Sequence, residues 1–279
     1  MTAGQLWAPV PGGRLWAQAG GSGPGVVLMH AGIADARMWD PQWEPLTAGH
    51  RVVRYDLRGF GRSQVEHVAF SNREDVLAVM DAAGLQQAVL VGCSRAGRIA
   101  IDTVLEFPDR VSGVVWVCGG LSGFEPDEAS AAELEPFDER EEALAAAKDW
   151  AGAAELDARV WVDGPREPAG SGPIAVRDLV RTMCFDTYAA ELPYGDDAEL
   201  EPAAATRLSE IRVPLLAIVG GRDPLVTART ADVLLRGVAG ARRIDRADVA
   251  HLPSLEQPAW FNETLLAFLA EVDGAARGT

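Results

Sequence analysis

A serine with small neighbours follows a short apolar run. Residues 89–100 read VLVGCSRAGRIA, so Ser94 lies where a strand passes into a helix. A turn that exposes a serine hydroxyl for attack strains the backbone and needs small residues two positions before and after it. Gly92 and Ala96 meet this demand, although G-x-S-x-G is the commoner pattern. The spacing predicts that Ser94 is a nucleophile; Cys93, expected to point away from the pocket, is the weaker alternative.

Two further residues could activate this serine. Asp223 follows the apolar run 215–219, and His251 lies between a predicted last strand, 242–246, and the final helix. A histidine can take the serine proton, and a carboxylate on its other ring nitrogen orients it and stabilises the cation that forms. Each could instead be an ordinary loop residue, since Asp before Pro is a common turn. The chain order serine, acid, histidine favours the catalytic interpretation.

Backbone amides for a developing oxyanion are expected in two places. One is the amide of Arg95, directly after the predicted nucleophile. The other lies in the loop after the apolar run 26–29, where Gly32 is the predicted donor and Ile33 the alternative.

The elements that would position these residues alternate along the chain. Apolar runs separated by helical patterns predict a parallel sheet with helices on both faces, that is, an α/β fold. The predicted strands are 26–29, 52–55, 88–91, 114–117, 215–219 and 242–246, with an edge hairpin of 5–10 and 14–18. The predicted helices are 37–46, 72–83, 95–107, 228–237 and 258–272.

Residues 121–205 interrupt this alternation with helical stretches such as 139–147. We therefore predict a core domain of residues 1–120 and 206–279 and a helical cap of residues 121–205 over the carboxyl ends of the strands. The cap segment holds 21 acidic and 6 basic side chains, which accounts for nearly all of the net charge of -16. Because no basic face is expected, nucleic acid is excluded as a partner.

Composition predicts a cytoplasmic protein that does not enter a membrane. No run approaches the roughly 20 apolar residues of a membrane span, and the first 20 residues do not resemble a signal peptide. Cys93, Cys118 and Cys184 fit neither a zinc site nor a redox pair, so reduced, buried thiols are expected. The oligomeric state is left open.

Taken together, the motifs resemble the α/β-hydrolase superfamily, especially its small capped members: enol-lactonases, esterases and cofactor-free haloperoxidases. The resemblance covers about residues 5–120 and 207–272. It rests on five segments, His30-Ala31-Gly32, Tyr55 to Ser63, Gly92 to Gly97, Gly221-Arg222-Asp223 and Ala250-His251. In that family His30 would shape the oxyanion loop and Asp56–Ser63 would form a tight turn.

The resemblance implies hydrolysis of a small-molecule ester or lactone through an acyl-enzyme, with no metal and no organic cofactor. Relatives that cleave haloalkanes or epoxides carry an aspartate at the position of Ser94, so both are disfavoured. Relatives that hydrolyse carbon–carbon bonds resemble a pattern with tryptophan directly after the triad histidine. This chain has Leu252 at that position, so the reaction is disfavoured. Carbon–carbon bond hydrolysis, a perhydrolase or haloperoxidase reaction, and a scaffold that only binds a ligand all stay open as alternatives.

The substrate pocket is the least defined part of the prediction. Candidate lining residues are Trp39, Trp150, Trp161, Met183, Phe185, Tyr188 and Leu225. Aromatic residues of this kind pack into cores at least as often as they line pockets. The side chain of Arg95 could recognise a substrate carboxylate or could pair with an acidic residue of the cap.

Overall fold

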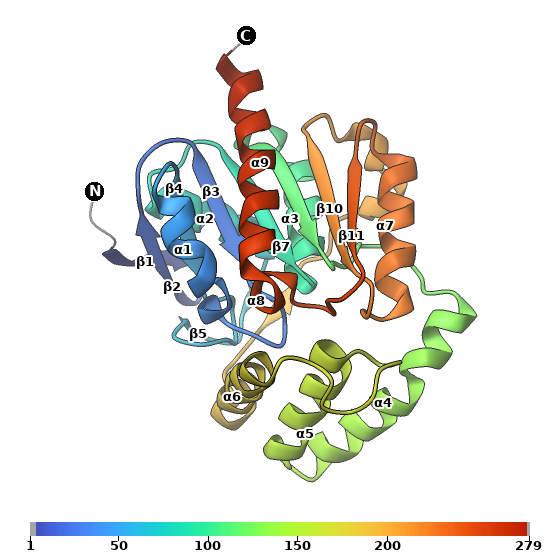
Figure 1. Ribbon diagram of the computed structural model, residues 1–279. Helices are drawn as coiled ribbons and strands as arrows, with labels where there is room; N and C mark the ends of the chain where they lie inside the picture. Colours follow the sequence, from blue (N-terminus) through green and yellow to red (C-terminus); the bar gives the residue numbers. More distant parts are fainter. Residues whose placement is uncertain (1–3, 278–279) are drawn as a thin grey trace.

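A mostly parallel sheet forms the centre of the computed structural model, which describes residues 4–277 (Figure 1). Its strand order is β1-β2-β4-β3-β7-β8-β10-β11; β2 is antiparallel to β1 and β4, and the neighbours from β4 onward are parallel. The bounds are β1 Gly4–Val10, β2 Gly13–Gly20, β3 Gly25–Met29, β4 Arg51–Tyr55, β7 Ala88–Cys93, β8 Val111–Val117, β10 Leu215–Gly220 and β11 Arg242–Arg246. The predicted α/β class is confirmed.

Helices cover both faces of the sheet because successive strand residues point to opposite sides. Val27 and Met29 pack into one core, whereas Val26 and Leu28 pack into the other. The first core includes residues of α2 (Asn72–Ala82), α3 (Arg95–Glu106) and α7 (Leu225–Gly237). The second includes residues of α1 (Asp40–Thr47) and α9 (Pro258–Arg277). Residues at the carboxyl ends of the strands are thus held by two packed layers.

Most predicted helices begin within a few residues of the observed ones. The predicted helix 37–46 is divided into a 3-10 turn, Ala36–Trp39, and α1. Helix α7 starts at Leu225, three residues before the predicted 228. Pro224 precedes it with extended backbone, and a proline beside the first turn removes no helical hydrogen bond. In residues 4–277 no helix combines the length and the apolarity needed to cross a lipid bilayer.

The segment after β8 forms a separate layer of helices that Figure 1 shows below the sheet. It contains α4 (Glu128–Ala146), α5 (Trp150–Asp157), a π-helical turn (Ala158–Asp163) and α6 (Ile174–Ala190). Of these, sequence reasoning named only part of α4. The chain returns through β9 (Asp196–Asp197), which pairs with β6 (Ala69–Phe70). The shorter elements are β5 Gln64–Val65, η2 Pro108–Arg110, η4 Ala204–Thr206, η5 Leu208–Glu210 and α8 Pro253–Glu256. The domain boundaries at 121 and 205 stay a prediction.

Candidate active site

Ser94 lies between β7 and α3 in a conformation that side chains rarely adopt, with φ 58° and ψ -122°. Hydrogen bonds hold it there: its amide donates to the Val117 carbonyl at 2.9 Å, and its carbonyl accepts from the amides of Gly97 and Gly120. Such backbone strain costs about 1–3 kcal/mol and persists only where the surroundings enforce it. The surroundings of Ser94 therefore enforce the sharp turn that the sequence predicts.

The small residues around Ser94 are required by close backbone contacts. A Cβ atom on Gly92 would lie 2.1 Å from the carbonyl oxygen of Ala96, a distance that no side chain tolerates. Ala96 itself is fully buried. Alanine in place of the second glycine of the usual pattern is thus accommodated, whereas Gly92 has no possible replacement without movement of the turn.

Asp223 and His251 form a buried hydrogen-bonded pair. Asp223 Oδ1 lies 2.7 Å from His251 Nδ1, and the two residues are 2% and 3% exposed. Gly220, at the end of β10, permits this approach, because a Cβ there would lie 1.8 Å from the Ala250 carbonyl. The pair fixes the ring so that Nε2 is the nitrogen left for other chemistry.

The loop that carries His251 is held by Glu256, a residue that sequence reasoning missed. Its carboxylate accepts hydrogen bonds from the amides of Ala250, at 2.8 Å, and Leu252, at 3.0 Å, which flank the histidine. Burial raises the pKa of Glu256 to about 7, although the hydrogen bonds from both amides act to lower it. A glutamate five residues after the histidine was the only sequence signal for this role.

Two cap residues hold the loop that carries Asp223. Glu133 of α4 accepts the amide hydrogen of Leu225 at 2.6 Å and forms an ion pair with Arg166. Arg166 in turn donates to the carbonyl of Asp223 at 2.7 Å. The acid of the buried pair is therefore connected to the cap by a charged link.

The loop after β3 has the features expected of an oxyanion loop. His30 is buried and connects this loop to the turn after β4: its Nε2 accepts the Leu57 amide at 2.9 Å, and its Nδ1 lies 2.8 Å from the Ala31 carbonyl. Burial lowers the pKa of His30 and so favours the neutral ring that this pattern requires. A Cβ on Gly32 would meet Arg95 Nε at 3.8 Å, so these two residues are neighbours. Within residues 4–277 neither of their amides donates a hydrogen bond.

The turn over Asp56–Ser63 is structural, as the resemblance implies. The Asp56 carboxylate accepts hydrogen bonds from the amides of Ala36 and Arg62, both at 2.9 Å. The hydroxyl of Ser63 donates to the Asp56 carbonyl. The polar groups of Asp56 and Ser63 therefore bond to the backbone of the turn and of its neighbours.

A cavity of about 310 Å³ adjoins some of the predicted groups, but Asp223, Gly32 and Ile33 are not in its lining. Ser94, Arg95 and His251 line it, together with Trp161, whose ring centroid lies 4.4 Å from that of His251. The Trp161 carbonyl also accepts the His251 amide at 3.1 Å. The other lining residues are Arg98, Cys118, Gly119, Gly120, Leu121, Phe124, Pro126, Val226, Thr227 and Thr230.

The other predicted pocket residues are not among those that line this cavity. Trp39 is fully buried beside Phe261, and Met183 is fully buried in the same core. Trp150 packs on Tyr188, whose hydroxyl donates to Asp157 at 2.6 Å, and Phe185 is 45% exposed. Leu225 is replaced in the lining by Val226. For most of these residues, packing against core or cap neighbours accounts for the position.

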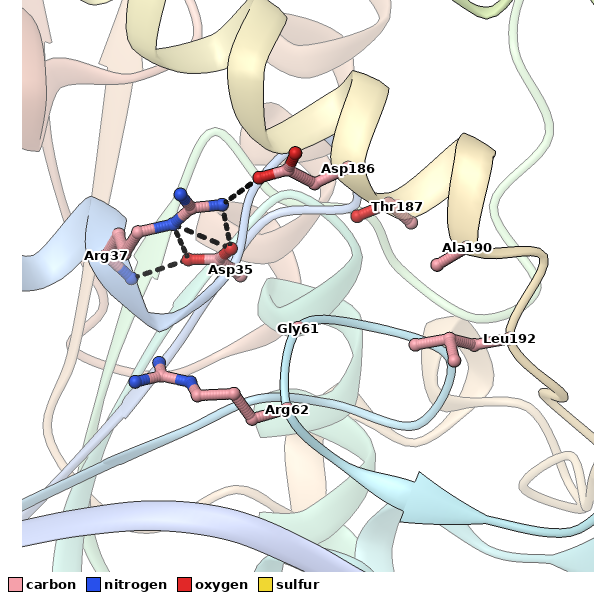
Figure 2. A pocket seen from close by; sticks show the side chains of 8 residues that line it. All are labelled: Asp35, Arg37, Gly61, Arg62, Asp186, Thr187, Ala190 and Leu192. Carbon is pink, nitrogen blue, oxygen red and sulfur yellow. Dashed lines mark hydrogen bonds and ion pairs between the residues drawn. The ribbon is translucent and has the colours of Figure 1, made fainter.

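Cap helix α6 contacts the loop of Gly32 and Ile33 directly. Cys184 Sγ lies 3.2 Å from the Ile33 carbonyl oxygen, to which it donates. Figure 2 shows Arg37 between Asp35, at 2.7 Å, and Asp186 of α6, at 2.9 Å. The carbonyl of Ile33 thus faces α6.

The cysteines are free and buried, as expected. Burial raises the pKa of Cys93 and Cys118 well above the usual range, which opposes a thiolate nucleophile. Ligating atoms of Cys118, Asp223 and His251 lie within 4.8 Å of one another, a set that could in principle hold a metal ion. In the structure, Asp223 Oδ1 and His251 Nδ1 are joined by the 2.7 Å hydrogen bond.

Two histidines outside the site differ in their surroundings. His50 is buried, at 8% exposed, and its Nε2 lies 3.2 Å from Asp273 Oδ2. His67 is exposed.

Comparison with known proteins identifies the family of this fold. The model of the family described as the alpha/beta hydrolase fold matches residues 24–258. A protein of Azorhizobium caulinodans named "Putative carbamate hydrolase RutD" is 29% identical over 251 residues, covering 88% of this chain and 92% of that protein. The 3-oxoadipate enol-lactonase 1 of Acinetobacter baylyi is 25% identical over 254 residues, covering 89% and 90%.

Among solved structures, carboxylesterase CesB (YbfK) of Bacillus subtilis superposes with a TM-score of 0.75. It covers 96% of this chain and 92% of its own, at 22% identity. This likeness concerns the fold alone.

Proposed function

Because the chain belongs to the α/β-hydrolase-fold family, we propose that it is a serine hydrolase that cleaves a small carboxylic ester or lactone. The Ser94 hydroxyl attacks the carbonyl carbon, and His251 takes its proton while Asp223 stabilises the imidazolium. The tetrahedral oxyanion is held by the amides of Arg95 and Gly32. The imidazolium then protonates the leaving alcohol as the ester C–O bond breaks.

The second half-reaction repeats these roles with water. His251 removes a proton from a water molecule that attacks the acyl-enzyme carbonyl, and the acid is released when Ser94 recovers its proton. In a lactone the alcohol and the acid leave as one molecule. None of these steps requires a metal ion or an organic cofactor.

The observation that carries this proposal is the buried 2.7 Å bond between Asp223 and His251 beside a serine in a strained turn. The backbone strain at Ser94 and the buried carboxylate of Asp223 both cost stability. Packing alone therefore does not explain them. All three residues follow strands of one sheet, and Ser94 and His251 line one cavity. The enol-lactonase relative supports a lactone as one substrate class.

The proposal is tested by turnover of 4-nitrophenyl acetate and of a panel of simple lactones. The wild type is expected to hydrolyse members of this panel, and Ser94→Ala is expected to lose turnover by several orders of magnitude. Equal turnover by wild type and Ser94→Ala would overturn the assignment. Bromination with hydrogen peroxide and acetate, but without lactone or ester hydrolysis, would favour the perhydrolase alternative.

We also propose that the protein works in the cytoplasm. The three free, buried cysteines support a reducing compartment.

A further inference from the structure

Arg95 carries an exposed charge that no acidic group neutralises. It is the residue directly after Ser94, and it is among the residues that line the same cavity as Ser94 and His251. In residues 4–277 no carboxylate lies within ion-pair distance of it, and its guanidinium makes no hydrogen bond. The chain as a whole has 41 acidic side chains against 25 basic ones. Other arginines of the described residues, such as Arg212 and Arg222, also lack a carboxylate partner, but Arg95 is the one that adjoins Ser94.

The surroundings of Arg95 fix its position without cancelling its charge. Its Cζ lies 5.6 Å from the ring centre of Phe60 and 5.3 Å from that of Tyr194, close enough for a cation–π contact with each. Its Nε lies 3.8 Å from the place of a Cβ on Gly32. The guanidinium is therefore held beside the proposed oxyanion loop.

The next arginine of the same helix provides a contrast. Arg98 also lines the cavity, but Asp197 forms an ion pair with it at 3.3 Å. Both arginines lie on α3, yet only Arg98 has a protein carboxylate as partner. Of the two alternatives left open for Arg95, pairing with an acidic residue of the cap is thus not found within residues 4–277.

We propose that Arg95 binds a carboxylate of the substrate, so that the preferred substrates are esters or lactones that carry a second, free carboxylate near the scissile bond. The guanidinium offers a planar pair of donors that matches a carboxylate. This inference rests on the proposed hydrolase function and specifies its substrate class.

Two pairs of chromogenic esters test the inference, each with a carboxylate replaced by a neutral primary amide. In the first pair the group ends the acyl chain: 4-nitrophenyl hydrogen adipate against 4-nitrophenyl adipamate. In the second pair the group is on the leaving side: the acetate ester of 4-hydroxy-3-nitrobenzoate against that of its amide. The quantity measured is the ratio of kcat/KM, carboxylate to amide, after subtraction of spontaneous hydrolysis.

In at least one pair, we expect the wild type to favour the carboxylate roughly tenfold or more at low salt, since charge-assisted bonds are the strong ones. Arg95→Gln should bring that ratio close to one, Arg95→Glu should invert it, and Arg98→Gln should preserve it. Because Arg95 is exposed, the wild-type ratio should also fall as sodium chloride is raised to about 0.5 M. This salt series tests the inference even if the variants do not fold.

Two results would overturn the inference. In the first, the wild type hydrolyses the amide esters through Ser94 but shows a ratio near one in both pairs; the proposed hydrolase function would then stand. In the second, the ratio of the wild type exceeds one but is unchanged in Arg95→Gln, which would place the anion elsewhere. If no ester is hydrolysed and Ser94 is inert, the proposed function itself fails.

Discussion

Replacing Glu256 by glutamine removes a carboxylate that is buried beside the amides of Ala250 and Leu252. Burial raises the pKa of Glu256 from 4.5 to about 7 in the folded protein. The folded state therefore holds its proton up to a higher pH than the unfolded chain does. The stability that protonated Glu256 contributes is fully present below about pH 4.5 and is lost as the pH rises through about 7.

The size of this effect follows from the two pKa values. At about 1.4 kcal/mol for each pKa unit, the full change is about 3 kcal/mol, of which about 2.5 kcal/mol falls between pH 5 and pH 8. Glutamine does not ionise in this range, so the variant lacks this part of the pH dependence. Other buried acids, such as Asp157 with its pKa raised to about 6, act equally in both proteins and cancel in the difference.

Urea unfolding at pH 5 and at pH 8 measures the prediction. The free energy of unfolding of the wild type, minus that of Glu256→Gln, should fall by about 2–3 kcal/mol from pH 5 to pH 8. The matched control is Glu263→Gln, an exposed glutamate of α9, whose difference from the wild type should stay constant. A constant difference for Glu256→Gln as well, or one that rises with pH, would refute the reasoning.

Three further substitutions probe the elements around the site. Asp223→Asn keeps the shape but loses the charge that stabilises the imidazolium, so kcat should fall by roughly 10,000-fold in ester turnover; a loss below tenfold would contradict its role. Arg166→Met removes the donor to the Asp223 carbonyl and should lower kcat by roughly tenfold, and unchanged kcat would show that the cap link is not needed. Gly92→Ala forces a Cβ to 2.1 Å from the Ala96 carbonyl and should cost more than about 3 kcal/mol of unfolding free energy by thermal melting. Gly49→Ala, with no atom within 4 Å of the new Cβ, is the control, and equal losses would contradict the steric argument.

The sheet and the three proposed catalytic residues could be predicted because their signals are local. The central strands β3, β7, β8 and β10 are largely apolar runs. Val26 and Val27 of β3 pack into cores on opposite faces of the sheet, so such a strand needs no polar face. Ser94 and Asp223 directly follow such runs, and His251 follows the last strand by a few residues. The order of elements therefore implied that these side chains meet at one edge of the sheet.

The cap and the pocket could not be predicted in the same way. Helical spacing tells which side of a helix is apolar but not which neighbour it meets, so Trp150 was assigned to the pocket although it packs on Tyr188. Trp161 was also assigned to the pocket and does line the cavity, although the π-helical turn that carries it has no reliable sequence signal. Val226 entered the cavity unforeseen because α7 begins before the predicted start.

The role of Glu256 was missed for a different reason. It binds backbone amides, and the sequence does not show which amides a side chain will reach. Glu133 likewise acts on the amide of Leu225, 92 positions away along the chain. Such contacts are set by tertiary packing and become visible only in the structure.

The reactivity of Ser94 tests the central claim most directly. The intact protein is treated with a fluorophosphonate, digested and examined by peptide mass spectrometry, in parallel with Ser94→Ala and His251→Ala. The account predicts a covalent adduct on Ser94 in the wild type, none in Ser94→Ala, and a rate of labelling lowered by several orders of magnitude in His251→Ala. An unlabelled wild type, or an adduct on another residue that forms equally in Ser94→Ala, would contradict it.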